Sequence, residues 1–212
     1  MRRMIKTFLF IFEPVKTWDQ VARASRGFWS LCFLNLLPMA VLAAAAEGYG
    51  LVRWGKYVET GYHGLRKFPV SQAVVYEILQ TSLLLLLILI LAQTLRSLGT
   101  TFHGRNTFTH GFTVVVHGLS PFFLLRLFDV FPVVYPWVSW SIGILLSMAI
   151  LYQGLPRVML PDPPHALGLY LVTCLVLLLA TGLLRFLTAW YLGGHFQVVE
   201  QWISALAARL PF

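Results

Sequence analysis

The sequence predicts an all-α membrane protein, a bundle of five transmembrane helices with amphipathic interfacial helices at both termini. Hydrophobic residues make up 58% of the 212 residues and charged residues 11%, whereas globular domains have about 25% charged residues. Five long apolar stretches carry almost no formal charge. Each is long enough to cross a bilayer, whose apolar core of ~30 Å needs ~20 helical residues. A soluble domain has no use for five such stretches.

The clearest span is Ile78–Leu95, which lies between Glu77 and Arg96 and contains the unbroken apolar run Leu83–Leu91. Short loops leave little chain for a soluble domain, so we predict one membrane domain over residues 27–192. Its five predicted spans are Gly27–Ala46, Ile78–Leu95, Thr107–Phe128, Val133–Leu155 and Ala166–Leu192.

Amphipathic segments flank this membrane domain. In the N-terminal segment 1–26, four apolar residues recur with the spacing of one helix face: Ile5, Phe8, Leu9 and Phe12. Pro14 ends this face, and a second short amphipathic piece carries Trp18. Residues 195–212 also place their apolar side chains on one face. We expect both terminal segments to lie in the membrane interface rather than to cross it.

The basic residues predict the orientation of the chain. Nine lie in segments on the same side as the N-terminus: Arg2, Arg3, Lys6, Lys16, Arg23, Arg26, Arg96, Arg105 and Arg157. Five lie on the opposite side: Arg53, Lys56, Arg66, Lys67 and Arg209. Because basic residues accumulate in the cytoplasm, we expect a cytoplasmic N-terminus and an external C-terminus.

Five ionisable residues fall at one depth, near the outer leaflet, in this topology. They are Glu47, Glu77, Arg126, Asp129 and Arg185. Ionisable groups in membrane helices usually face the bundle interior and pair with one another. We therefore predict a structural ion-pair cluster, with a proton or ion pathway and simple snorkelling to the interface as the alternatives.

Polar residues and prolines also mark the middle of two spans. Asn35 and Pro38 lie in the first span, and His117, Ser120 and Pro121 lie in the third. Proline leaves a backbone carbonyl without its helical donor, which neighbouring polar side chains satisfy. We predict a kink at Pro121 and a hydrogen bond from Asn35 near His117 or Ser120. A substrate site between two broken helices is the alternative.

No motif predicts an enzyme, a metal or a cofactor. His103, His110 and His117 recur every seven residues, but seven residues rise ~10.5 Å along a helix, too far for two of them to share one ion. The sequence has no G-x-S-x-G, no H-E-x-x-H and no phosphate loop. The net charge of +8 comes from basic residues at span ends, where they contact anionic lipid headgroups. We expect membrane lipids and no nucleic acid as partners.

Three stretches together resemble the bacterial branch of the Yip (Ypt/Rab-interacting protein) membrane family. The first is Phe12-Glu13-Pro14-Val15 with Trp18; the second is Gly104, Phe108, Val114–Val116 and Ser120-Pro121; the third is Tyr152–Leu155, Pro161 and Ala166–Gly168. The resemblance implies a five-helix membrane fold without known catalytic residues. It also implies a multi-pass protein of a prokaryotic plasma (inner) membrane. Rab binding should not carry over, because only about 26 residues precede the first span.

These observations lead to two hypotheses about function. We expect a non-enzymatic integral partner or scaffold subunit of a membrane assembly, with other membrane proteins as its partners. The alternative is a small-solute or lipid transporter that uses the polar break in the first and third spans. A polar cavity that reaches His117 would favour transport, whereas a sealed bundle with an exposed aromatic face would favour the scaffold.

Overall fold

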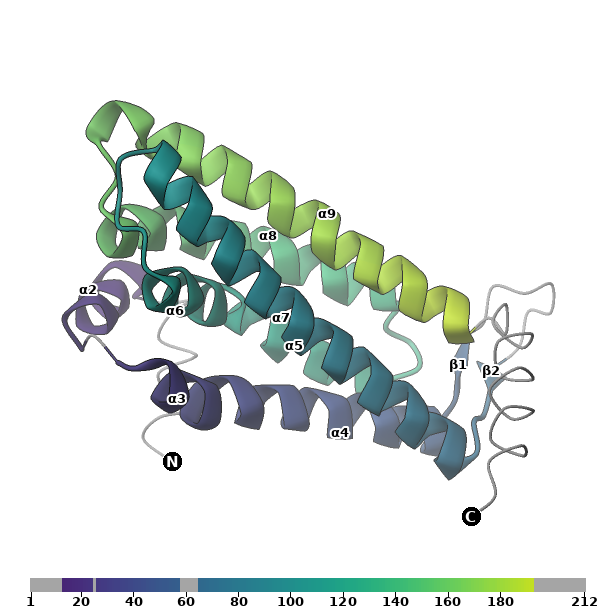
Figure 1. The fold of residues 1–212 in the computed structure, drawn as a ribbon. Coiled ribbons are helices and arrows are strands. Elements are labelled where there is room, and N and C mark those ends of the chain that lie inside the picture. The colour runs from purple at the N-terminus through teal and green to yellow at the C-terminus, as the bar shows by residue number, and fades with distance from the viewer. Residues whose placement is uncertain (1–12, 25, 58–64, 193–212) are drawn as a thin grey trace, which may run out of the picture.

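The structure, a computed structural model, describes residues 13–24, 26–57 and 65–192. Within them, five helical segments long and apolar enough to cross a membrane pack into one bundle (Figure 1). They are Phe28–Arg53, Val70–Thr101, Phe108–Val130, Pro136–Met159 and Pro163–Leu192. The prediction of an all-α membrane protein with five spans is confirmed. The helices predicted from Ile5–Phe12 and from residues 195–212 lie outside the described residues.

The first span is built from three helical pieces. The short α3 (Phe28–Leu31) continues into a π-helix (Cys32–Leu36) and then into α4 (Leu37–Arg53). Pro38 has no N–H to donate to the preceding turn, and the wider π-helical turn comes directly before it. Asn35 lies in this π-helix. The first span is also the least buried of the five.

The second span, α5 (Val70–Thr101), is a single helix of 32 residues, about 48 Å long. A ribbon of two short antiparallel strands, β1 (Lys56–Tyr57) and β2 (Leu65–Arg66), precedes it. Both α4 and α5 extend past the apolar stretches that predicted them. The apolar stretches stop at Glu47 and Glu77, but these side chains are buried close to Arg126, so the helices continue through them.

The third span lies at the centre of the bundle, with 78% of its most apolar window buried, against 22–44% in the other spans. It comprises α6 (Phe108–Gly118), α7 (Ser120–Arg126) and a 3-10 turn (Leu127–Val130). The helix breaks at Leu119, and Pro121 then lies in the first turn of α7, where a missing N–H is tolerated.

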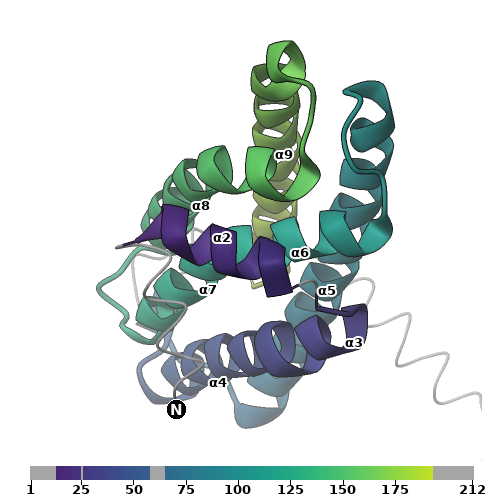
Figure 2. The same cartoon turned by 90° about the vertical axis from the view of Figure 1, so that its left-hand side faces the viewer.

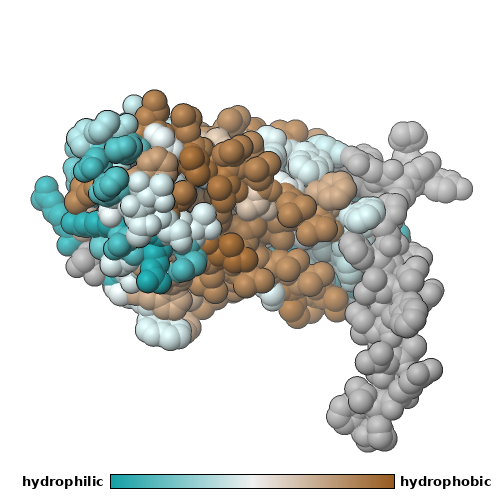
Figure 3. Space-filling model, turned by 45° about the horizontal axis from the view of Figure 1, so that its top comes forward, coloured by the Kyte–Doolittle hydropathy of each residue, from teal (hydrophilic) through white to brown (hydrophobic). Residues whose placement is uncertain are grey.

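The fourth and fifth spans are α8 (Pro136–Met159) and α9 (Ala166–Leu192), joined through a 3-10 turn (Pro163–His165). In Figure 1, α5 and α9 run beside each other along the bundle. In Figure 3, apolar residues cover the middle of the visible face and polar residues gather at one end. An apolar middle with a polar end is the surface expected of a membrane-spanning bundle.

Helix α2 (Pro14–Ala24) lies across one end of this bundle (Figure 2). Its Trp18 is fully buried, and the indole Nε1 donates a hydrogen bond of 3.0 Å to the carbonyl of Ile150 in α8. The indole ring lies so close to Gly154 that a Cβ there would overlap it. Arg157 of α8 also contacts Asp19 of α2, at 3.1 Å. Trp18 therefore anchors α2 to the fourth span.

The contact between Trp18 and Gly154 yields a stability prediction. Gly154→Ala adds a methyl group against the indole ring, and overpacking of this kind costs ~1–3 kcal/mol. We expect a lower melting temperature in detergent. Gly182→Ala in α9 is the matched control, because its Cβ would meet Trp140 only at an ordinary 3.4 Å. Equal melting temperatures for the two variants would contradict the anchoring role of Trp18.

Candidate functional site

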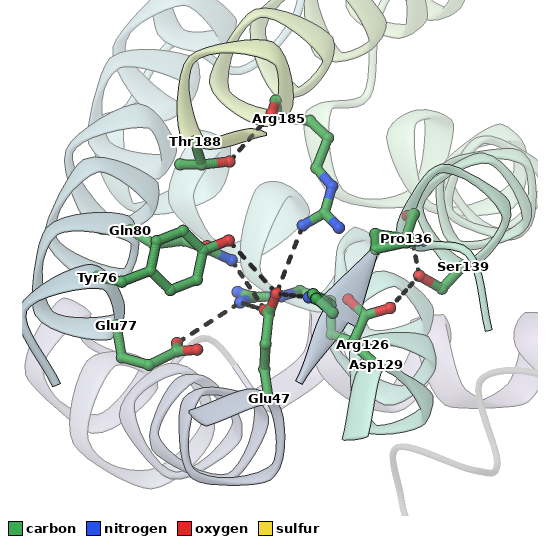
Figure 4. A network of polar contacts seen from close by, with 11 residues as sticks. Glu47, Tyr76, Glu77, Gln80, Arg126, Asp129, Pro136, Ser139, Arg185 and Thr188 are labelled. Atoms are coloured by element: carbon green, nitrogen blue, oxygen red, sulfur yellow. Dashed lines mark hydrogen bonds and ion pairs between the residues drawn. The ribbon is translucent and has the colours of Figure 1, made fainter. Parts of the chain in front are cut away.

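A buried carboxylate, Glu47 of α4, is the centre of the polar network in Figure 4. Its side chain is 0% exposed. Oε2 accepts hydrogen bonds from Arg126 Nη2 at 2.6 Å and from Gln80 Nε2 at 3.0 Å. Oε1 accepts from Lys56 Nζ and, at 3.4 Å, from the Tyr76 hydroxyl. Both oxygens of this carboxylate are therefore satisfied inside the bundle.

Two further ionisable residues lie around this carboxylate. Arg185 Nη1 is 3.7 Å from Glu47 Oε1, and Glu77 Oε2 is 4.0 Å from Arg126 Nη2. Neither oxygen of Glu77 accepts a hydrogen bond from the residues that the structure describes. Among the residues with a described position, Glu77 therefore has a cation near it but no hydrogen-bond donor.

Asp129, the fifth residue of the predicted cluster, lies at the end of the third span. Its carboxylate accepts a hydrogen bond from the Ser139 hydroxyl of α8. Asp129 also lines a small cavity of about 20 Å³ together with Gln80, Arg126, Trp140 and Arg185. Each of those four residues has a buried polar atom without a hydrogen-bond partner among the described residues. Several polar atoms of the cluster that lack such a partner therefore surround one cavity, whereas the carboxylate of Glu77 lies outside it.

The five residues predicted from the sequence therefore lie together in the structure. The cluster contains three acidic and three basic side chains, which balance formally: Glu47, Glu77, Asp129, Lys56, Arg126 and Arg185. With Ser139 from α8, all five spans contribute a side chain. Such an arrangement joins the spans through charge and hydrogen bonds at one depth of the bundle.

Sequence reasoning missed four members of this network: Lys56, Tyr76, Gln80 and Ser139. The signal for two of them was present, because Ala73, Tyr76 and Gln80 follow the three-to-four-residue spacing of the buried face of α5. Lys56 has no such spacing, and the distribution of basic residues predicts an external loop position for it. The ribbon of β1 and β2 follows Gly55, whose φ of 84° reverses the chain, and Lys56 is buried there.

With this geometry in place, comparison with known proteins decides the family. A family model described as the Yip1 domain matches residues 8–184. The chain belongs to the Yip1 domain family. No curated protein and no solved structure matches it. The resemblance of the sequence to the Yip family is thus confirmed.

In this Yip-family protein, residues from each of the three stretches that carry the resemblance meet at one end of the bundle. Trp18 of the first stretch lies against Gly154 of the third. Gly104 of the second stretch lies against the backbone of Met159 and Pro161, so closely that a Cβ would not fit. The backbone N–H of Arg105 donates to the Met159 carbonyl at 2.5 Å. Trp18, Gly104, Gly154 and Pro161 therefore contribute to the packing at this end of the fold.

The predicted midplane residues take separate places in the structure. His117, Ser120 and Pro121 are buried in the third span, while Pro38 and Asn35 are half-buried in the first. His117 Nδ1 donates to the Thr113 carbonyl at 2.9 Å in its own helix. The His117 ring meets the Trp18 ring edge-on, with 6.1 Å between centroids.

The predicted hydrogen bond from the Asn35 amide is not formed. Its nitrogen is buried and donates to no acceptor among the described residues. The Ser120 hydroxyl of α7 lies 3.4 Å from the Val116 carbonyl of α6 and donates to it across the break at Leu119. The polar groups near the break thus bond within the third span, because an accessible carbonyl four residues earlier is the nearest acceptor.

Removing the central charge should destabilise this Yip-family protein strongly. Glu47→Gln keeps the side-chain shape but leaves three buried cations without their carboxylate, and breaking a buried ion pair in this way costs ~3–5 kcal/mol. We expect a large drop of the melting temperature in detergent. The same substitution at Glu13, which pairs with Lys16 at the exposed start of α2, should cost less than ~1 kcal/mol. Similar effects at both positions would show that the buried network is not needed for stability.

Proposed function

We propose that this Yip-family protein is a non-enzymatic integral partner or scaffold subunit of a membrane assembly, which binds a transmembrane helix of another membrane protein. The observation that carries the proposal is a groove of about 660 Å³ between α4 and α5. The groove is lined mostly by apolar side chains, on the outward face of the first and second spans.

The walls of this groove suit a helix. Ala44, Ala45 and Gly48 of α4 and Ala73 of α5 line it, and small residues let the backbones of membrane helices approach closely. The outward face of the first span is also rich in exposed aromatic side chains, with Trp29 stacked on Phe33 at 5.8 Å. Exposed aromatic side chains on the same span as a groove of small residues support the scaffold hypothesis.

Two polar side chains lie in the wall of this groove. Glu77 and Thr81 line it, but their side-chain oxygens are buried and have no hydrogen-bond partner among the described residues. Within a membrane, such groups are stabilised when a neighbouring helix provides a partner. A docked helix with a polar side chain at this depth offers that partner once Glu77 or Thr81 turns outward, whereas an acyl chain carries no donor.

The transport hypothesis receives less support. It depends on polar groups in the middle of the first and third spans that are available to a solute. His117 instead donates to its own helix and packs against Trp18. A cavity lined by Leu95, Leu119 and Leu151 in the same region is apolar and measures about 10 Å³. For the charged cluster around Glu47, we propose a structural role, because its acidic and basic members are formally balanced.

We further propose that the protein is of the bacterial branch and lies in a prokaryotic plasma membrane. The N-terminus is then cytoplasmic and the C-terminus external, with membrane lipids around the bundle. The excess of basic residues on the side of the N-terminus supports this orientation. The sequence contains no G-x-S-x-G, H-E-x-x-H or phosphate-loop motif, and this supports a role in assembly rather than in catalysis.

Photocrosslinking in native membranes tests the groove. A photoreactive amino acid in place of Tyr49, which is exposed in the groove, should form a discrete adduct with another membrane protein. The Ala45→Leu change fills the groove and should abolish this adduct, while Ala189→Leu, at an exposed position of α9, should leave it unchanged. Adducts with lipid alone, or an equal adduct from a probe at Phe186 of α9, would refute helix docking in the groove.

Reporter fusions test the orientation. A reporter that is active only outside the cytoplasm should be active when fused after Phe212 and inactive when inserted within Ser97–Asn106, because basic residues hold the second segment in the cytoplasm. The enzymatic activity of each fusion, normalised to its expression, is the measurement. The opposite pattern would reverse the topology and place the charged cluster near the cytoplasmic leaflet.

A further inference from the structure

Two loops at one end of the bundle bring three metal-ligating side chains together. His103 lies in the loop between α5 and α6, and Asp162 and His165 lie in the loop between α8 and α9. The potential ligand atoms of all three lie within 4.8 Å of one another. The rings of His103 and His165 have centroids 5.5 Å apart. In the sequence, His103 is regularly spaced with His110 and His117. In the fold, it lies beside His165 instead.

The backbone holds these loops in a fixed relation. The Arg105 N–H donates to the Met159 carbonyl at 2.5 Å, which joins the two loops directly. Within the second loop, the His165 N–H donates to the Asp162 carbonyl at 2.8 Å. His103 has a φ of 52°, in the left-handed region that non-glycine residues seldom adopt. A strained backbone conformation persists only where the surrounding structure fixes it. The conformation of His103 places its imidazole next to Asp162 and His165.

We propose that His103, Asp162 and His165 form a binding site for a divalent transition-metal ion, for which Zn²⁺ is the best-fitting probe. Two imidazoles and one carboxylate are ligands that Zn²⁺ accepts, whereas Mg²⁺ and Ca²⁺ require mostly oxygen ligands. Bonds of about 2.0–2.2 Å around a tetrahedral ion place the donor atoms roughly 3.4 Å apart. All three side chains are exposed, so rotation about their χ angles closes the remaining distance.

A bound ion would link two loops of the protein and would keep one coordination position open. An ion held there connects the loop after the second span to the loop before the fifth, in addition to the bond between Arg105 and Met159. Because an ion that binds only the folded state stabilises it, Zn²⁺ should raise the melting temperature. Three protein ligands also leave a fourth position of the tetrahedron for water or for a ligand from another molecule.

Metal titration of the whole protein tests the proposal. The full chain, purified in detergent without a polyhistidine tag and stripped with a chelator, is titrated with ZnCl₂ by calorimetry. We expect one ion per chain, and His165→Gln and Asp162→Asn should each weaken binding by ~100-fold or more, since even changes outside the ligand set cost 10–100-fold. Co²⁺ should give the visible absorption of a low-coordinate site, and His165→Gln should remove it. Stoichiometric binding that persists in His165→Gln would overturn the proposal, as would no binding at all.

Control variants locate the ion among the six histidines of the chain. A variant with His63→Gln and His195→Gln should keep the affinity of the wild type, as should His110→Gln. The metal-free melting temperature of His165→Gln should equal that of the wild type, because the side chain is exposed. Loss of binding in the double variant with retention in His165→Gln would place the ion elsewhere and refute the site.

Discussion

A single buried carboxylate joins four of the five spans. Glu47 is removed from water, and its charge is stable there only because cations from three other parts of the chain converge on it: Lys56, Arg126 and Arg185. Each of those cations would be equally costly in the bundle without the carboxylate. The positions of the first, third and fifth spans are therefore mutually dependent, and the second joins them through Gln80 and Tyr76.

The five spans and most of the charged cluster could be predicted from the sequence, because a membrane span requires a long, uninterrupted stretch of apolar residues. Apolar length gives the spans, and charges inside or at the ends of apolar stretches mark positions that must find partners. The helix ends were less predictable, since Glu47 and Glu77 terminate the apolar runs but not the helices. Lys56 could not be predicted at all: its burial depends on a two-stranded ribbon that no hydropathy pattern indicates.

The histidines also show what sequence spacing cannot predict. Regular spacing within one segment is visible in the sequence, so His103, His110 and His117 attracted attention. The proximity of His103 to His165 depends on two loops that meet through backbone hydrogen bonds, and the residues that make those bonds carry no side-chain signal. Contacts between loops are set by the packing of the helices they connect, which sequence periodicity does not encode.

Glu77 belongs to both the buried cluster and the groove. It lies 4.0 Å from Arg126 in the buried cluster, and it also lines the groove between α4 and α5. A helix docked in that groove would pack over the side chain whose buried carboxylate compensates Arg126 at a distance. It would remove the remaining exposure of Glu77, so binding in the groove would alter the electrostatic balance around Glu47. A change at the surface of the first two spans would in this way reach the interaction that joins four of the five spans.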